Sequence, residues 1–316
     1  MLRKIVLLLV CLTIINSSFA TTWDEPWADE VIKQSSSFVL AQVVSCNADS
    51  GVSIRIIKTL SGKVLSDSIF ISDFYLLSLC SSSGDGPEFH IPVVDSCYFF
   101  ITQNKEGKYC IATPSTGFDY VYQGKVAATF RHSYHQALVH VQVYEKMMTA
   151  VFNNYHGQPY DEASVTAYVN ECISKKPAGF SDEEIGTFFE QHVALECVYH
   201  LKLKVDEQKM FPFLQDTANF HNQVSAARAL VACNTATARN ELLKIVCDTT
   251  MKPFVQVICI WTLGALDAKS IKPQLVKALA YASDNENNFG GNIMDPRVCT
   301  HLPTVKEALS TLVGKL

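Results

Sequence analysis

Histidine and glutamate recur at a helical spacing near the middle of the chain, and these residue types could bind a metal ion. His192, Glu196 and His200 are four residues apart, so on one α-helix their side chains would lie within one stripe. Imidazole and carboxylate are zinc ligands, and bound zinc can activate water for hydrolysis. However, metalloprotease helices place the catalytic glutamate directly after the first histidine, where this chain has Val193. The stripe predicts either a zinc site or a polar seam packed on neighbouring helices.

A second polar group lies where the strand-like half of the chain meets the helical half. Arg131, His132 and His135 cluster there, and two histidines three residues apart could share one helix face. Clefts between domains often hold ligands, so the three residues are candidate binding residues. The alternative is that Ser133 caps the helix and that the other polar groups satisfy exposed backbone at the junction.

A polar segment near the C-terminus supplies the remaining candidates. Residues 283–302 are rich in Asn and Gly, and a loop of this length inside a helical array is usually functional or disordered. Acidic and amide residues between Asp284 and Asp295 imitate the oxygen ligands of a calcium loop, but Phe289 stands where such a loop needs glycine. We therefore interpret the segment as a recognition loop. Its candidate binding residues are Asn288, Asn292, Asp295 and Arg297.

The elements that would position these groups differ between the two halves of the chain. From Phe38 to about Phe130 the apolar runs are short, rich in β-branched and aromatic residues, and separated by turn residues, as is typical of strands. Such a series predicts a small β-barrel or sandwich. Beyond this point the apolar period becomes helical, with a first helix predicted from Tyr134. The sequence thus predicts an α+β protein with a β-domain at 21–130 and a helical domain at 131–316.

The helical half contains a repeat with a period of 33 residues. Gln223–Leu230 aligns with Gln256–Leu263, and a second apolar stretch follows each copy, at Leu242–Val246 and at Leu275–Leu279. Two amphipathic helices per unit are the signature of an α-solenoid, whose units bury their apolar faces against their neighbours. These segments resemble HEAT-like repeats over residues 221–282. The resemblance implies an architecture and no particular activity.

The first half also resembles the β-barrel of tissue inhibitors of metalloproteinases and of netrin-like modules. The likeness lies in Phe38–Val44, Lys58–Gly62 and the strand Tyr98–Ile101. Those inhibitors begin at a free cysteine that chelates the protease zinc, whereas this chain would begin at Thr21, so protease inhibition is not implied. As a whole, the chain resembles an exported bacterial HEAT-repeat protein with a β-domain in front.

Residues 1–20 predict a signal peptide. Arg3 and Lys4 precede the apolar run 5–15, and Ser18 and Ala20 are small residues at the expected cleavage positions. This run is too short to span a bilayer, and no later window reaches the roughly 18 apolar residues that a spanning helix needs. We therefore expect a secreted or periplasmic protein, cleaved near Ala20, without a transmembrane segment.

The net charge of the chain limits the class of partner that it can bind. The chain has 26 Lys and Arg against 31 Asp and Glu, and this net charge of −5 argues against a nucleic-acid partner.

An exported protein can keep disulfides, and the chain has 11 cysteines. Among Cys46, Cys80, Cys97 and Cys110 we prefer the pair Cys80 with Cys97, which would close the loop 81–96. The cysteines farther along sit mostly on apolar helical positions, as buried thiols do.

Together these features predict a non-enzymatic, exported interaction protein that uses no cofactor. Its solenoid groove would bind a peptide or protein partner. The competing hypothesis is a zinc-dependent hydrolase that uses either the pair of His132 and His135 or the stripe of His192, Glu196 and His200. The exposure of these three side chains separates the two hypotheses, because a buried stripe would be scaffold whereas a stripe open to a cleft would support the enzyme.

Overall fold

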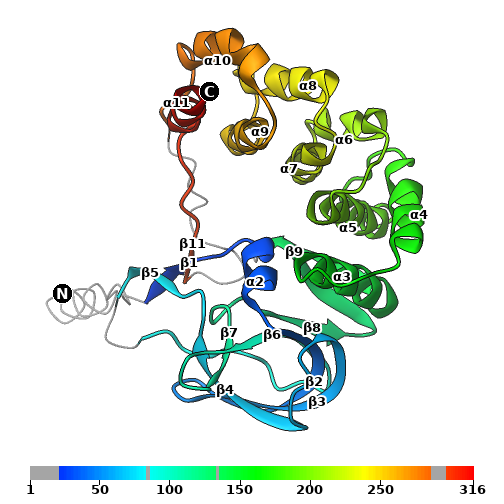
Figure 1. Cartoon of the computed structure of the whole chain (residues 1–316), viewed down its shortest axis with the longest axis vertical. Coiled ribbons are helices and arrows are strands. Elements are labelled where there is room, and N and C mark those ends of the chain that lie inside the picture. The colour runs from blue at the N-terminus through cyan, green and yellow to red at the C-terminus, as the bar shows by residue number, and fades with distance from the viewer. Residues whose placement is uncertain (1–20, 83–85, 133–134, 286–296) are drawn as a thin grey trace, which may run out of the picture.

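The structure of the protein is a computed structural model. The part of the chain that it describes comprises residues 21–82, 86–132, 135–285 and 297–316. The predicted signal peptide at 1–20 lies outside the described residues, as do Asn288, Asn292 and Asp295. Strands come first and an arc of helices follows, so the protein is α+β (Figure 1). Among the described residues, no helix has both the length and the apolar composition needed to cross a bilayer.

Five strands close a β-barrel in the N-terminal part, which confirms the predicted barrel. In order around the barrel these are β6 (Cys97–Gln103), β2 (Ser37–Asn47), β3 (Gly51–Gly62), β4 (Ser68–Phe74) and β7 (Tyr109–Ile111), and β7 pairs back with β6. Only the pair of β4 with β7 is parallel. Alternate side chains of a strand point to the same face, and on β2 Val39, Ala41 and Val43 are buried in the barrel core.

Three further strands extend this sheet from β6 toward the helices. They are β8 (Phe118–Tyr122), β9 (Lys125–His132) and β10 (His135–His140), all antiparallel. The helix predicted from Tyr134 is therefore wrong for residues 135–140, and the first long helix, α3, begins at Val141. The burial of β10 has period two, because Ala137 and Val139 are buried whereas Leu138 between them is 44% exposed.

A separate sheet of three short strands brings distant parts of the chain together. Its middle strand β1 (Thr22–Asp24) pairs antiparallel with β5 (Ser78–Ser81) and parallel with β11 (Val298–Cys299). Helix α2 (Ala28–Gln34) follows β1 and contacts β6, β9 and α3. In Figure 1 the segment between β11 and the last helix leads from the far end of the arc back to β1.

The remaining helices follow an arc in two layers (Figure 1). They are α3 (Val141–Tyr155), α4 (Glu162–Ile173), α5 (Ile185–Leu201), α6 (Phe211–Leu214), α7 (Phe220–Ala229), α8 (Ala236–Cys247), α9 (Pro253–Ala265), α10 (Lys272–Leu279) and α11 (Val305–Lys315). Helices α3, α5, α7, α9 and α11 contact one another in succession on the inner side, and α4, α6, α8 and α10 lie on the outer side. Each copy of the 33-residue repeat is a helix pair, α7 with α8 and α9 with α10.

The apolar core of the protein has two parts. One part fills the barrel, and the other runs through the helices onto α2 and the strands β8 to β10.

Every cysteine in the described part of the chain is a free thiol. The predicted bridge between Cys80 and Cys97 is wrong, because Cys97 is fully buried at the start of β6 whereas Cys80 is exposed on β5. Among the later cysteines, Cys172, Cys197 and Cys259 are buried helical thiols, as expected, whereas Cys247 is exposed and Cys299 lies on strand β11.

Candidate functional site

Helix α5 carries the histidine stripe and lies in the middle of the molecule. It contacts α3, α4 and α7, together with strand β10. Its residues are apolar around most of the circumference, and such a helix is buried on all sides. His192, Glu196 and His200 are accordingly at most 1% exposed. The stripe therefore does not face solvent.

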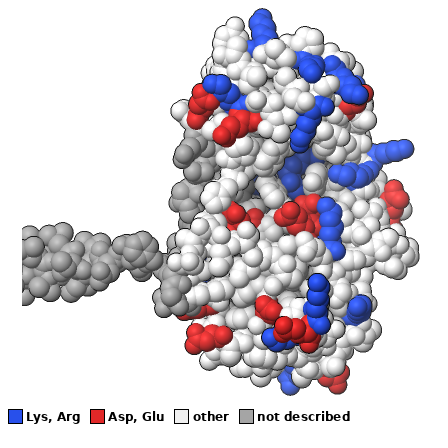
Figure 2. Space-filling view, turned by 60° about the vertical axis from the view of Figure 1, so that its left-hand side comes forward, with Lys and Arg blue, Asp and Glu red and all other residues white. Residues whose placement is uncertain are grey.

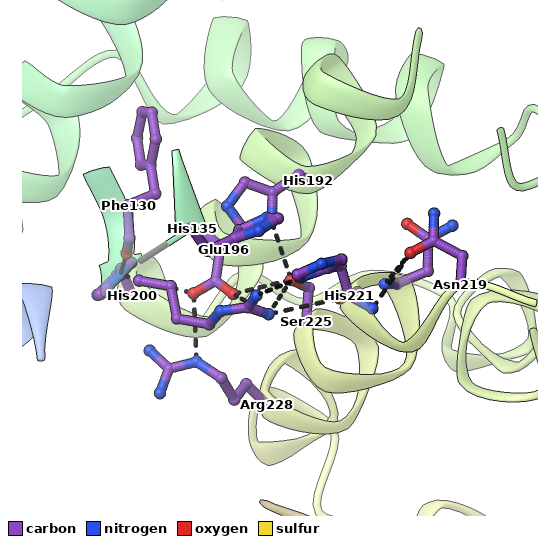
Figure 3. Close-up of polar contacts among 11 residues, drawn as sticks. Phe130, His135, His192, Glu196, His200, Asn219, His221, Ser225 and Arg228 are labelled. Atoms are coloured by element: carbon purple, nitrogen blue, oxygen red, sulfur yellow. Dashed lines mark hydrogen bonds and ion pairs between the residues drawn. The ribbon is translucent and has the colours of Figure 1, made fainter. Parts of the chain in front are cut away.

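Glu196 is the centre of a buried charge network (Figure 3). Its carboxylate accepts hydrogen bonds from Ser225 Oγ at 3.0 Å and from Arg228 Nε at 3.2 Å, both on α7. Arg131 Nη1 on β9 lies 4.0 Å from the same carboxylate and donates to Ser225 Oγ at 3.1 Å. A buried carboxylate is costly unless it is paired, and here two guanidinium groups surround it. Asp29 on α2 adds a second negative charge that acts on Arg228.

Three imidazoles pack beside this carboxylate. His192 Nδ1 lies 3.0 Å from Ser225 Oγ and 3.2 Å from His135 Nε2, and His135 stacks on His221 with ring centroids 4.2 Å apart. Burial, followed by the charge of Arg131, lowers the pKa of His135 and His192 far below the usual value. The same causes lower the pKa of His221 to about 3. All three rings are therefore neutral near pH 7.

A serine, a histidine and a carboxylate in contact are the groups that activate a nucleophile in many hydrolases. Here the Ser225 hydroxyl donates to Glu196 rather than to His192, the residue that would act as the general base. Ser225 is also fully buried, so no substrate can reach its oxygen in this conformation. The geometry instead ties β9 and β10 to α5 and α7 through buried polar contacts, within which His192 Nε2 and Arg228 Nη2 have no hydrogen-bond partner in the described part of the chain.

His200, the third residue of the stripe, is occupied at both ring nitrogens. Nε2 lies 2.7 Å from the backbone oxygen of Phe130, and Nδ1 lies 2.7 Å from the Tyr155 hydroxyl. Nε2 must donate to the carbonyl, so Nδ1 accepts from Tyr155 and keeps no lone pair for a metal. Burial lowers the pKa of His200 to about 4 although the nearby Glu196 favours the charged ring. The stripe shares a helix face, as its spacing predicted, but its side chains bind protein groups.

The junction residues Arg131, His132 and His135 lie together, although in the interior. His132 and His135 are cross-strand partners at the β9–β10 hairpin, so the predicted helix-face relation between them is wrong. All three side chains are at most 5% exposed. His132 Nε2 lies 3.0 Å from the backbone oxygen of Glu25, and its ring meets the edge of Trp27. Ser133, the predicted cap, falls outside the described residues.

Arg297 is the one recognition-loop candidate within the described residues, and it lies apart from this network. Its Nη1 donates to the backbone oxygen of Glu88 at 3.3 Å, and its guanidinium lies 4.8 Å from the ring centroid of Trp23. The structure therefore brings Arg131 and His135 to the buried histidines and places Arg297 at the three-stranded sheet.

Sequence reasoning missed Ser225 and Arg228, although the repeat contained a signal for both. One period later, the corresponding positions are Ile258 and Trp261. A serine and an arginine at positions that are apolar in the other copy indicate a buried face with polar partners. A position-by-position comparison of the two copies would therefore have singled them out.

An open pocket of about 510 Å³ lies between the ends of α8, α9 and α10. Its apolar lining comes from Leu243, Val246, Met251, Pro253, Ala278, Tyr281 and Ala282. Its polar lining comes from Thr249, Gln256, Gln274, Lys277, Ser283 and Asn285, together with the Cys247 thiol. Lys277 is the one charged side chain among these described lining residues. The buried histidines take no part in this pocket.

Surface charge adds a further observation. Figure 2 shows Lys and Arg side chains interspersed with Asp and Glu over the described part of the visible face.

Comparison of the chain with protein-family models, with curated proteins and with solved structures finds no match.

Proposed function

We propose that the chain is a non-enzymatic interaction protein that binds a peptide segment of a partner in the pocket between α8, α9 and α10. The observation that carries the proposal is the pocket itself, which is open, has a volume of about 510 Å³ and mixes apolar with polar lining. Sites for small ligands span roughly 300–1,000 Å³ and have this mixed character. The interspersed surface charges in Figure 2 also favour a protein partner over nucleic acid.

The proposal interprets the helical part as a HEAT-like solenoid of an exported protein. Two helix pairs at a 33-residue period, α7 with α8 and α9 with α10, support this interpretation. So does the succession of contacts among the inner helices. Solenoids present extended surfaces for partners, and the pocket lies between neighbouring units, where such surfaces are formed.

The pocket lining indicates the chemistry of the peptide. Leu243, Met251 and Tyr281 would take an apolar side chain, and the amides of Gln274 and Asn285 could pair with the peptide backbone. A peptide carboxylate next to this apolar residue would pair with the ammonium group of Lys277. The preferred ligand is therefore an apolar residue adjacent to an acidic one.

The burial of the histidine stripe supports a scaffold role for those residues. His192, Glu196 and His200 hydrogen-bond to strand and helix partners, and none of the three lines the pocket. Their contribution to binding is therefore indirect, since they hold α5 and α7 in place beneath the next repeat unit.

The pocket can be tested by filling it. Ala282 lines the pocket and is half-buried, so Ala282→Trp would place an indole inside it. A displayed library of random peptides would be selected on the full chain, and binding of an enriched peptide would be measured by fluorescence anisotropy. We expect A282W to weaken this binding at least about tenfold, which corresponds to about 1.4 kcal/mol.

The matched control is Ala265→Trp, which adds the same indole to an exposed position at the end of α9 and outside the pocket lining. We expect A265W to bind the peptide like the wild-type chain. Equal binding by A282W, or a library that shows no enrichment over an unrelated protein, would refute the proposal.

A further inference from the structure

The three-stranded sheet gathers metal-binding side chains from both ends of the described chain. Asp24 lies on β1, Cys80 on β5 and Cys299 on β11, and His301 follows two residues after Cys299. In the strand register Asp24 is the direct partner of Cys299. Figure 1 shows that β11 reaches β1 at the end of the segment that comes from α11. Pairing of the strands thus places a carboxylate, two thiols and an imidazole at one edge.

The donor atoms of Asp24, Cys80 and His301 converge on one point. His301 Nδ1 lies 2.5 Å from Asp24 Oδ1 and 3.9 Å from Cys80 Sγ. One ligand atom from each of these three residues lies within 4.8 Å of the others, and no other such group occurs in the described ranges. Cys299 lies beside this group, because it is the register partner of Asp24 on the neighbouring strand. Partial desolvation raises the pKa of the exposed Cys80 thiol, and a hydrogen bond with Cys299 and the charge of Asp24 raise it further.

Ordinary surface contacts do not account for this composition. An imidazole beside a carboxylate is a common ion pair and needs no metal ion. Two thiols from strands that are more than two hundred residues apart in sequence have no part in such a pair. Neighbouring ligand atoms of a tetrahedral zinc ion lie about 3.3–3.8 Å apart. The 3.9 Å between His301 Nδ1 and Cys80 Sγ is close to this, whereas the 2.5 Å contact between His301 Nδ1 and Asp24 Oδ1 is that of an ion pair and would lengthen by about 1 Å when the ion binds.

We propose that Asp24, Cys80, Cys299 and His301 bind one zinc ion. Thiolate and imidazole donors select zinc over calcium and magnesium, which prefer oxygen ligands in larger number. Binding would release the protons of both thiols, so that two thiolates and one carboxylate surround the cation. The Cys80 and His301 side chains are exposed, and the ion therefore has a direct path from solvent.

The position of the site gives the ion a structural role. Strand β11 has only two residues, and its attachment to β1 includes the bonds from Trp23 N to Arg297 O at 3.2 Å and from Glu25 N to Cys299 O at 3.3 Å. Zinc bound across β1, β5 and β11 would close the arc by fastening the segment before α11 to the N-terminal sheet. This role is independent of the peptide pocket, because none of the four ligands lines that pocket.

The test measures metal in the full chain, purified with a reductant and without chelator. We expect stoichiometric zinc in a colorimetric assay, and a thiolate-to-cobalt charge-transfer band when Co²⁺ replaces zinc. Cys80→Ser and His301→Gln should lose the zinc and the rise in melting temperature that zinc confers on the wild type. Circular dichroism of the variants would verify that they remain folded, as expected for exposed positions.

Two matched controls remove the same residue types elsewhere. Cys247→Ser changes another exposed thiol, and His90→Gln changes an exposed imidazole that pairs with Glu88. Both controls should keep the zinc. The proposal is overturned if the wild type retains no zinc and gives no cobalt band, or if C80S and H301Q retain as much zinc as the controls. It is also overturned if mass spectrometry of the untreated protein finds Cys80 and Cys299 joined in a disulfide, because these sulfurs would then be unable to bind the ion.

Discussion

At the scale of single residues, the buried network around Glu196 shows how this protein handles charge in its interior. One carboxylate receives hydrogen bonds from Ser225 and Arg228, and the guanidinium of Arg131 lies nearby. The neighbouring histidines stay neutral because burial and the arginine charges disfavour their protonation. The ionisation state of each group in the network therefore depends on the charges of its neighbours.

Glu196→Gln is the substitution that tests this dependence. It removes the negative charge and leaves two arginines in the interior without it, so we expect the free energy of unfolding to fall by about 3–5 kcal/mol. Urea denaturation followed by circular dichroism would measure the loss. The control Glu171→Gln breaks an exposed pair with Lys175 and should cost about 0.5 kcal/mol or less. A loss in E196Q no larger than in the control would contradict the network.

At the scale of elements, periodicity predicted the helices of the repeat and the barrel strands, but it failed at residues 135–140. Tyr134, Leu138 and Val141 fit a helical period, yet the chain pairs with β9 and forms β10. A short apolar run fits both periods, and the available edge of the sheet decides between them. At the other end of the arc, Thr304 and Glu307 form a capping box at the start of α11.

Thr304→Ala tests this cap. The Thr304 hydroxyl accepts from Glu307 N at 3.1 Å, and Glu307 Oε2 accepts from Thr304 N at 2.8 Å. Losing the first bond should cost about 1 kcal/mol, mostly as faster amide exchange within α11. Hydrogen–deuterium exchange read by mass spectrometry would show this change. Thr311→Ala, at an exposed position of the same helix, should leave the exchange unchanged or slower. Unchanged exchange in T304A would show that the cap does not stabilise α11.

At the scale of the whole molecule, the strands β9 and β10 that extend the barrel sheet share a buried, histidine-rich interface with the helices. Strands β9 and β10 contribute Arg131, His132 and His135, and α5 contributes His192 and His200. The apolar core that surrounds them continues from the extended sheet through the helices. Ionisation of this interface therefore affects the stability of the entire chain.

The pH dependence of stability follows from these buried imidazoles. Burial lowers the pKa of His132 to about 3, of His200 to about 4 and of His221 to about 3, against about 6.5 in an unfolded chain. The folded state binds fewer protons, so stability is complete above about pH 6.5 and falls as the pH drops toward the folded-state values. Asp119 opposes this slope, because burial raises its pKa to about 6 and the folded state then binds more protons below that pH.

Since the histidines outnumber this single carboxyl group, we expect the melting temperature to fall steadily when the pH is lowered from about 7 to about 4.5. Differential scanning calorimetry across this range would measure the fall. His200→Gln should flatten the slope, whereas His90→Gln, at an exposed position, should leave it as in the wild type. A melting temperature that does not change over this range would contradict neutral histidines in the folded interior.

Apolar spacing specifies most of the local elements of this chain, because it acts over a few residues. The sequence predicted the barrel strands from Phe38 onward, the helix pairs of the 33-residue repeat and the shared face of His192, Glu196 and His200. The surroundings of each side chain depend on helix docking and strand register, which join segments far apart in the sequence. Only docking buried the stripe beside Ser225, and only strand pairing placed Asp24 opposite Cys299.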